Sequence, residues 1–600
     1  MLDVTNGITA FEHRDVLLIV IFIAGCLIEL YRGFKEFHFL WQPRYRYRAI
    51  IGAGLFLIVI FVWTRGWVSN ITFIIIFFLW AVMLFLMCLS LKMILWPCSS
   101  VFNKIGIHVR AGEDEIAENM LSRYRWFCVD PLMRFKWYCL HANAQSIKGG
   151  PREAFEILHG FNENLLFEYE KDSLTITKSG YLLQLGNYKG AIASISKLKN
   201  VDGDLVLQRA NIMSVCQEVR GELSASSDIL ISALTSTENM TSKSLPIIFN
   251  NLGRIRKFEG NNTEAFLYYE KAANAAVKMG KKHLVHITYQ NLILSYALDE
   301  KYEKAEAWID NYRSQIDNAN VNDLQEFVNL MLGYYRQKCD KEKILSTIEI
   351  GRSVLYPKLT DRQKIIYDIC ELRIRWNSQL LRPSFLAHIE QQLDKYLILN
   401  LTERYNSLKE INIVLRQLKE RNELGHFLSF HEIVYRHIKK MEPDIEKYLL
   451  TLPEYCVNEK CHLLWELASI QKIDGAHYDY QKVLQRLSDL KDTRLKYGNY
   501  LDSLTAGLDI CDEAVFQNKK DLVWQSVKQS IKELERFKGH AVEAQCFIRI
   551  ACYAHYVGQQ RCAEEYFYRF EKTGMSINHF SDWIQNYYNY LLINLKPYHI

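Results

Sequence analysis

The chain has 600 residues, more than one compact core holds, so several domains or one elongated repeat array are expected. Its composition, 49% hydrophobic and 24% charged, excludes a disordered chain, and 10 prolines and 28 glycines are too few for a turn-rich all-β protein of this length. A net charge of +5 gives no reason to expect nucleic acid as a partner.

Three apolar runs lie within the first hundred residues, at 16–31, 49–63 and 68–96. A helix needs about 20 residues to cross the hydrocarbon layer of a membrane. The third run is long enough, whereas the first two are marginal and could instead form a shallow re-entrant pair. The sequence therefore predicts a membrane module with two to three transmembrane helices over residues 1–97.

The orientation of this module follows from its charged loops. Five basic residues stand between positions 32 and 48 against a single acid, Glu36. Basic loops stay in the cytoplasm, so three spans would place the N-terminus outside and the chain after Trp96 inside. Scattered cysteines without a CxxC pair also indicate a reducing compartment. We therefore expect an integral protein of the bacterial inner membrane with a cytoplasmic C-terminal part.

Two further features of this region concern lipid. Residues 23–26 (IAGC) fit a lipoprotein signal box, but the preceding residues are acidic and the apolar run continues past Cys26. Residues 41–48 (WQPRYRYR) mix aromatic and basic side chains, which suits the headgroup layer of an anionic leaflet. Membrane lipid is therefore an expected partner.

From about residue 100, amphipathic helical patterns alternate with short polar turns. In residues 249–272 (FNNLGRIRKFEGNNTEAFLYYEKA), Gly253, Gly260, Ala265 and Ala272 stand among bulky neighbours. Two antiparallel helices approach to about 8–10 Å only where small side chains lie between them. We expect Gly253 and Ala265 at the crossing point of one helical hairpin, and Ala272 where the next hairpin docks.

This pattern resembles the tetratricopeptide repeat family, in which an aromatic residue, Leu-Gly, a turn glycine and two alanines mark each unit. It recurs about every forty residues, most clearly over 179–200, 247–280, 286–320, 325–353 and 545–575. The family's closing proline is replaced by Val277, and the spacing exceeds the usual length of about 34 residues. The resemblance implies an all-α fold in which residues 98–600 form an α-solenoid.

Stacked hairpins create a concave groove lined by the first helix of each unit, and such grooves bind peptides or partner helices. The residues expected to project into this groove and to contact a partner protein are Asn250, Arg254, Lys257, Gln290, Leu294, Tyr334 and Gln337.

Enzyme motifs are absent from the sequence, so we expect no catalytic or cofactor-binding residues and no small-molecule substrate. Cys456, Cys461 and His462 are crowded, but no second pair stands nearby to complete a tetrahedral zinc site, and no metal site is expected. One enzyme hypothesis stays open, namely an unrecognised site in the weakly patterned region 340–540. It would show itself as a pocket with convergent polar groups that interrupts the repeat geometry.

We interpret the chain as a membrane-anchored scaffold that binds partner proteins and helps to assemble or regulate a membrane complex. Its layout is similar to that of PelE-type proteins of bacterial exopolysaccharide assembly, which implies subunits of a membrane complex as partners. The alternative layout is that of HemY-like proteins, whose repeats lie on the outer side of the inner membrane.

Overall fold

The computed structural model describes residues 100–109, 114–125, 131–148, 150–166, 168–198, 203–236, 242, 244–280, 282–316, 320–473, 479–575, 577 and 580–595. These residues form helices and connections without β-strands, which confirms the all-α prediction for this part of the chain. No helix in these ranges combines the length and the apolar character needed to cross a membrane. The three apolar runs and the expected boundary at 97/98 lie outside the described residues, so the membrane module stays a prediction.

The chain divides into two compact units, residues 1–174 and 175–600. In the first unit, residues 100–109 are helical, and α5, α6 and α7 follow. Its core contains Ile105, Leu121 and Trp137, and the Trp137 indole donates to the Leu121 carbonyl at 2.8 Å. The elements are α5 (Asp114–Tyr124), α6 (Pro131–Lys148), α7 (Pro151–His159) and the 3₁₀ turn η3 (Glu163–Leu165).

The second unit is a series of helices that begins within α8. Its first half contains α8 (Glu168–Gln184), α9 (Tyr188–Ile195), α10 (Asp204–Glu218), α11 (Leu223–Ser236), α12 (Leu245–Phe258), α13 (Asn262–Lys278), α14 (Lys282–Leu298), α15 (Tyr302–Ser314), α16 (Val321–Gln337) and α17 (Lys341–Ile350). Its second half contains α18 (Asp361–Asn377), α19 (Pro383–Gln391), α20 (Leu401–Glu420), α21 (Leu428–Thr451), α22 (Val457–Ile473), α23 (Tyr480–Lys496), α24 (Tyr500–Phe516), α25 (Lys520–Leu534), α26 (Val542–Tyr556), α27 (Gln560–Lys572) and α28 (Asp582–Leu595).

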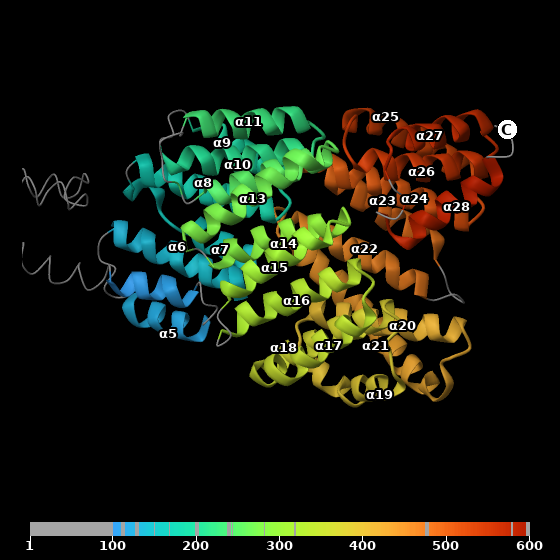
Figure 1. The fold of residues 1–600 in the computed structure, drawn as a ribbon, viewed down its shortest axis with the longest axis horizontal. Coiled ribbons are helices and arrows are strands. Elements are labelled where there is room, and N and C mark those ends of the chain that lie inside the picture. Colours follow the sequence, from blue (N-terminus) through green and yellow to red (C-terminus); the bar gives the residue numbers. More distant parts are fainter. Residues whose placement is uncertain are drawn as a thin grey trace, which may run out of the picture. The chain divides into compact units, whose positions relative to one another are not determined.

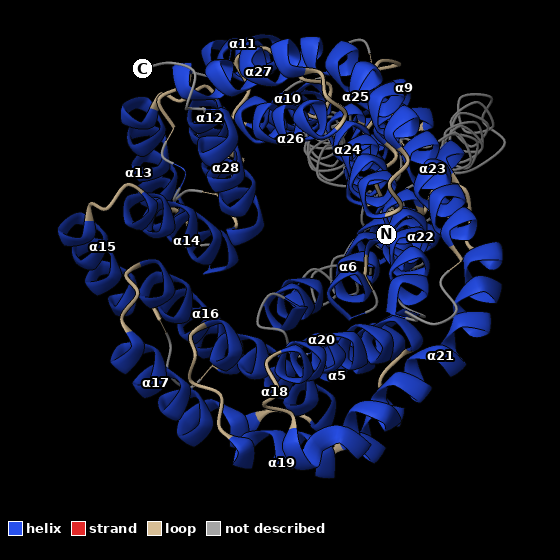
Figure 2. Cartoon of the chain, turned by 90° about the vertical axis from the view of Figure 1, so that its right-hand side faces the viewer, coloured by secondary structure: helices blue, strands red, loops and turns tan. Residues whose placement is uncertain are grey.

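Consecutive helices of this unit pack as hairpins, among them α10 with α11, α12 with α13, α24 with α25 and α26 with α27. The first helix of a hairpin also packs against the first helix of the next one, as α10, α12, α14 and α16 do in turn. Figure 2 shows these first helices on the inner side of a curved array. This arrangement is an α-solenoid of tetratricopeptide-like helix pairs.

The hairpin of α12 and α13 shows why small residues recur. Gly260 turns the chain with a φ of 76°, and the Asn261 side chain caps α13 by accepting from the Glu264 amide at 3.2 Å. A Cβ added at Gly253 would lie 2.7 Å from the Tyr269 ring on α13. The prediction that Gly253 marks a helix crossing is confirmed, although the side chain facing it is Tyr269 rather than Ala265.

Polar side chains tie successive hairpins together at the period of the repeat. The Asn291 amide donates to Asn250 at 2.8 Å across 41 positions, and Arg254 donates to Glu218 at 2.8 Å across 36 positions. Asn251 likewise donates to the Asn211 side chain across 40 positions. The two asparagine links join equivalent positions of neighbouring first helices, and they confirm a repeat of about forty residues, whereas the Arg254 link reaches one helical turn further along α10.

The region without clear repeat motifs departs from the standard hairpin. A π-helix, η4 (Gly351–Leu355), and a 3₁₀ turn, η5 (Tyr356–Lys358), follow α17 directly. The short α19 is followed by the 3₁₀ segment η6 (Leu393–Ile398), and the 24-residue α21 holds Pro443 in its interior. The chain is helical here, but its second helices are broken or extended, which explains why the motif fades. Two further 3₁₀ turns are η7 (Gly425–Phe427) and η8 (Glu535–Phe537).

The path of the second unit returns on itself. The helices α22, α24 and α26 begin where α8, α10 and α12 end, and the two sets lie end to end (Figure 1, Figure 2). We call this joint the seam. It contains four backbone hydrogen bonds, from the amides of Asn458, Leu501, Ala541 and Lys189 to the carbonyls of Leu185, Val219, Phe258 and Tyr497.

Candidate partner-binding site

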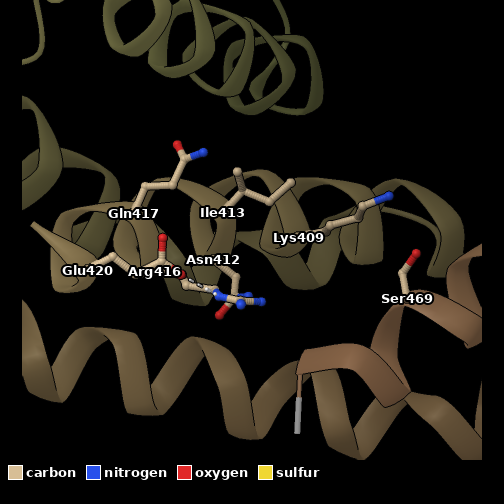
Figure 3. A pocket seen from close by; sticks show the side chains of 7 residues that line it. All are labelled: Lys409, Asn412, Ile413, Arg416, Gln417, Glu420 and Ser469. Carbon is tan, nitrogen blue, oxygen red and sulfur yellow. Dashed lines mark hydrogen bonds and ion pairs between the residues drawn. The ribbon is translucent and has the colours of Figure 1, made fainter. Parts of the chain in front are cut away.

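A cavity of about 410 Å³ lies along one face of α20. The side chains that line it stand three or four positions apart, which places them on a single helix face, with one addition from α22 (Figure 3). These residues are Lys409, Asn412, Ile413, Arg416, Gln417, Glu420 and Ser469.

The sequence around α20 fixes this face toward the cavity. Asn400 and Glu403 form a capping box, in which the Glu403 amide donates to Asn400 at 2.8 Å and the Asn400 amide donates to Glu403 at 3.3 Å. The other side of the helix is apolar and buried, with Leu408, Ile411 and Leu415 each at most 2% exposed. Burial of that side leaves the face from Lys409 to Glu420 open.

Asn412 is unusual among the residues of this face. The residue is only 2% exposed, and its Oδ1 atom has no hydrogen-bond partner among the residues that the structure describes. Buried polar atoms are nearly always hydrogen-bonded, because an unpaired one costs about 1–3 kcal/mol. The Oδ1 atom of Asn412 is therefore an enclosed acceptor without a partner beside the cavity.

The charges beside the cavity are balanced in pairs. Lys409 donates to both oxygens of Glu466, at 2.8 and 2.7 Å, and Glu466 is itself 2% exposed. Arg416 pairs with Glu420 at 3.0 Å on the exposed side of the helix. Burial raises the pKa of Tyr405, and the Glu466 carboxylate adds to that rise, so this phenol stays neutral. The site therefore favours a polar but uncharged ligand, with Ile413 as an exposed apolar contact.

A second polar cluster lies where the repeat geometry is interrupted. Arg352 of the π-helix pairs with Glu371 at 2.7 Å and with Asp368 at 2.5 Å, and Arg375 pairs with Glu371 at 2.6 Å. Burial opposes the charge of Arg352, but the carboxylates of Glu371 and Asp368 outweigh it and raise the pKa above its ordinary value. The groups of this cluster neutralise one another, and none of them lines the cavity on α20. That the chain is not an enzyme stays a prediction.

The seven residues expected in the groove lie elsewhere, and none lines this cavity. Asn250 and Tyr334 are buried, 9% and 1% exposed, because they link neighbouring helices. Their expected projection into an open groove is therefore wrong. Tyr334 donates to Glu306 at 2.9 Å, and Lys257 donates to the Ser295 hydroxyl at 3.1 Å.

The remaining four residues are at least partly accessible. Arg254 pairs with Glu218, Gln290 and Leu294 are half-buried, and Gln337 is exposed. Their contact with a partner stays a prediction.

The crowded Cys456, Cys461 and His462 do not form a common site. Both cysteines are buried, whereas the His462 side chain is 39% exposed and lies 3.7 Å from Glu466. Among the residues that the structure describes, no group of three His, Cys, Asp or Glu side chains could hold a metal ion.

Comparisons with known proteins give little beyond these observations. No family model and no curated protein matches the sequence. Among solved structures, 57% of this chain aligns with 99% of a Rap protein complexed with competence and sporulation factor, at 11% identity and a TM-score of 0.31. An IFIT1 mutant with Gppp-AAAA aligns over 73% of this chain and 90% of its own, at 12% identity and 0.28.

A third solved structure, Naa15/Naa10 bound to HypK-THB, aligns over 84% of this chain and 89% of its own, at 14% identity and a TM-score of 0.15. At scores this low the assignment of the fold rests on the helix pairs of the chain itself.

Proposed function

We propose that this chain is a protein-interaction scaffold that holds an extended segment of a partner protein along the exposed face of α20. The observation that carries the proposal is the buried Oδ1 of Asn412 beside the cavity, which has no partner among the described residues and would meet one when its side chain turns toward a bound peptide. A peptide main chain presents N–H donors at regular intervals, and a donor is the group that this acceptor lacks.

The dimensions of the face also suit an extended chain. The face from Lys409 to Glu420 is about 16 Å long at the rise of an α-helix, which about five residues of an extended peptide cover. Ile413 is 38% exposed and offers an apolar contact for one side chain of such a peptide. The paired charges of Lys409 and Arg416 leave no net charge that would select a strongly acidic or basic segment.

The apolar runs at 16–31, 49–63 and 68–96 support membrane anchoring as part of this proposal. The basic loop between the first two runs favours repeats on the cytoplasmic side of a bacterial inner membrane. The partner would then be a subunit of a membrane complex, with exopolysaccharide assembly as one candidate pathway. Repeats on the outer side, as in the HemY-like layout, are the alternative.

Replacing Asn412 with leucine is expected to separate folding from binding. The leucine removes a buried amide oxygen that has no partner, so the free energy of unfolding should rise by about 1–3 kcal/mol. Peptides selected from a random displayed library on the wild-type chain should bind the variant at least about tenfold more weakly, since each 1.4 kcal/mol changes affinity tenfold. Urea denaturation and fluorescence anisotropy measure the two effects, with the protein prepared from detergent-solubilised membranes.

The matched control is Asn251→Leu, because Asn251 is also a buried asparagine on a first helix but bonds Asn211. This control should lower stability and leave peptide affinity unchanged. Equal peptide affinity for the wild type and Asn412→Leu would contradict a binding site on α20. Recovery of the chain in the soluble fraction, without detergent, would contradict the membrane anchor.

A further inference from the structure

The seam joins helix ends that would otherwise leave backbone groups unpaired. The last carbonyls of a helix and the first amides of the next lack partners within their own helices. At the seam, the Val219 carbonyl at the end of α10 accepts from Leu501 at the start of α24 at 3.1 Å. The Phe258 carbonyl at the end of α12 accepts from Ala541 before α26 at 2.9 Å. This end-to-end contact also aligns the helix dipoles head to tail.

Side chains reinforce the seam over long sequence separations. The Asn458 side chain donates to the Gln184 carbonyl at 2.8 Å across 274 positions. The Lys189 side chain donates to the Leu495 carbonyl at 3.3 Å across 306 positions. Every hydrogen bond described here ends on a backbone carbonyl, so the seam depends on how closely the main chains approach.

Two glycines permit that approach. Gly186 and Gly221 turn with φ of 82° and 88°, and a Cβ on either would meet the opposite side of the seam. At Gly221 that Cβ would lie 2.6 Å from the Arg536 carbonyl oxygen, which belongs to the backbone. Gly558 has the same turn geometry, with φ of 82°, but nothing lies within 4 Å of its Cβ position. Close packing at Gly221 is therefore a property of the seam rather than of hairpin turns.

The apolar cores on the two sides of the seam are distinct. One buried cluster, which includes Leu207 and Ile255, belongs to the hairpins before the seam, and another, which includes Leu504 and Leu595, belongs to those after it. The ring contact between Phe258 and His540, stacked at 4.8 Å, bridges the two sides. The hairpins thus keep their own cores whether or not the seam is closed.

His540 is placed to report on that closure. It is 5% exposed, its Nδ1 accepts from the Val542 amide at 3.0 Å, and its Nε2 has no partner within the described part of the chain. Burial lowers the pKa of His540 to about 4. None of the charged residues on the surrounding segments forms an ion pair with it. These residues are Arg256, Lys257 and Glu259 around the end of α12, Glu535 and Arg536 of η8, Lys538 of the connection, and Glu543 of α26.

We propose that the seam is a separable closure that opens while the hairpins stay folded, and that protonation of His540 promotes its opening. A proton on Nδ1 would remove the acceptor for the Val542 amide and place a charge against Phe258 without a counter-ion. In the open seam the imidazole meets water and regains its ordinary affinity for the proton. Closure is therefore fully favoured above about pH 6.5 and weakens as the pH falls toward about 4.

Hydrogen exchange of the full chain tests separability at neutral pH. In Gly221→Ala, the amides of Asn458, Leu501 and Ala541 are expected to exchange at least about tenfold faster than in the control Gly558→Ala. Amides in the middle of α12 and α26 should exchange at the same rate in both variants. Equal seam exchange in the two variants overturns the proposal, and so does a loss of protection that extends through the hairpins.

The role of His540 is tested on the wild-type fold. With a pKa of 6.5 in the open seam and about 4 in the closed one, the opening constant should rise about tenfold between pH 7.5 and pH 5.5. Exchange of the seam amides, corrected for the intrinsic effect of pH, reports this constant. His540→Asn keeps an acceptor for the Val542 amide but does not titrate, so its constant should not change. A constant wild-type value, or an equal rise in His540→Asn, overturns the proposal.

Discussion

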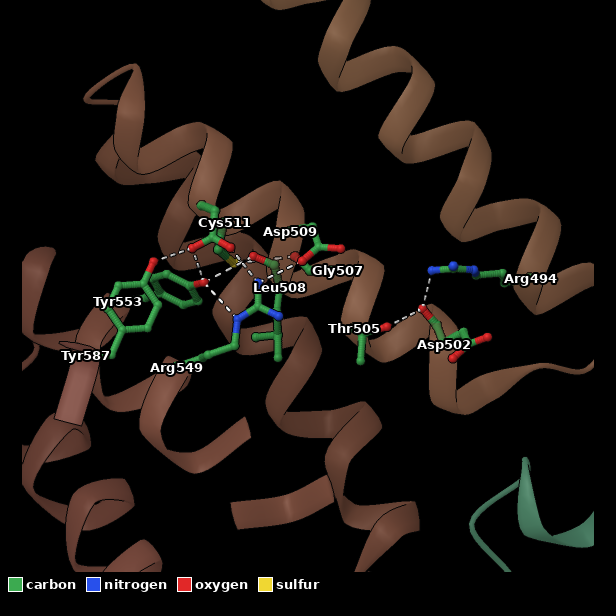
Figure 4. A network of polar contacts seen from close by, with 11 residues as sticks. Arg494, Asp502, Thr505, Gly507, Leu508, Asp509, Cys511, Arg549, Tyr553 and Tyr587 are labelled. Atoms are coloured by element: carbon green, nitrogen blue, oxygen red, sulfur yellow. Dashed lines mark hydrogen bonds and ion pairs between the residues drawn. The ribbon is translucent and has the colours of Figure 1, made fainter. Parts of the chain in front are cut away.

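Replacing Arg549 with leucine is expected to lower the free energy of unfolding of the C-terminal hairpins by about 3–5 kcal/mol. Arg549 on α26 is only 2% exposed, and its guanidinium donates to Asp509 at 2.9 Å and to Asp512 at 2.6 Å on α24 (Figure 4). Removing one member of a buried ion pair leaves the other charge without compensation. Leucine would fill part of the space but leave both carboxylates without their cation.

The same network holds the last helix in place. Asp512 also accepts from the Tyr553 hydroxyl at 2.5 Å and from Tyr587 of α28 at 2.6 Å. Burial raises the pKa of Asp509, and Arg549 opposes that rise. Without the arginine the pKa of Asp509 rises further, so protonation relieves the unpaired charge. The deficit of the variant should therefore shrink as the pH falls from 7.5 to 5.

Urea titration followed by hydrogen exchange of residues 500–595 measures this loss locally, since a chain of several units need not unfold in one step. The control is Arg436→Leu, because Arg436 forms an exposed pair with Glu432 one turn away on α21. Such pairs contribute about 0.5 kcal/mol or less. If Arg549→Leu loses no more stability than this control, the network does not stabilise the C-terminal hairpins.

Gly253→Ala is expected to destabilise the hairpin of α12 and α13, whereas Gly333→Ala is not. Both glycines follow a leucine on the first helix of a hairpin. At Gly253 the added Cβ would meet the Tyr269 ring at 2.7 Å, and overpacking of this kind costs about 1–3 kcal/mol. At Gly333 it would lie 3.3 Å from the end of the Leu294 side chain, which can rotate away.

The two variants share the gain in helix propensity, up to about 1 kcal/mol. Gly253→Ala should therefore lose about 1–2 kcal/mol net, and Gly333→Ala should be neutral or slightly more stable. Hydrogen exchange of α12 and α16 in urea compares them directly. Equal stability of the two variants would mean that the α12 crossing adapts to a methyl group.

The hairpins could be predicted because their signal lies in side chains. Small residues such as Gly253 and aromatic residues such as Tyr269 recur where helices cross, and the sequence displays this directly. The repeat motif is weaker in the region that contains η4 and the short α19, because broken helices shift the spacing of those residues. The helical period survives there, but the repeat motif does not.

The candidate site could not be predicted from residue type. Asn250 and Asn412 are both asparagines on first helices, and the sequence alone favoured Asn250. Their difference depends on a neighbour about forty residues away, since Asn291 donates to Asn250 whereas no described residue donates to Oδ1 of Asn412. The seam could not be predicted from residue types either, because its hydrogen bonds end on main-chain carbonyls, which every residue carries.

An ordinary helical-repeat protein can gain or lose a unit during evolution with little penalty, because each unit contacts only its neighbours. This chain cannot do so, because the seam joins hairpins that lie far apart in the sequence. Asn458 must meet Gln184 across 274 positions, and an extra hairpin between them would offset every later helix end from its counterpart. The fold therefore fixes the number of hairpins between Gln184 and Asn458. Duplication of a single hairpin should be tolerated only outside this part of the chain.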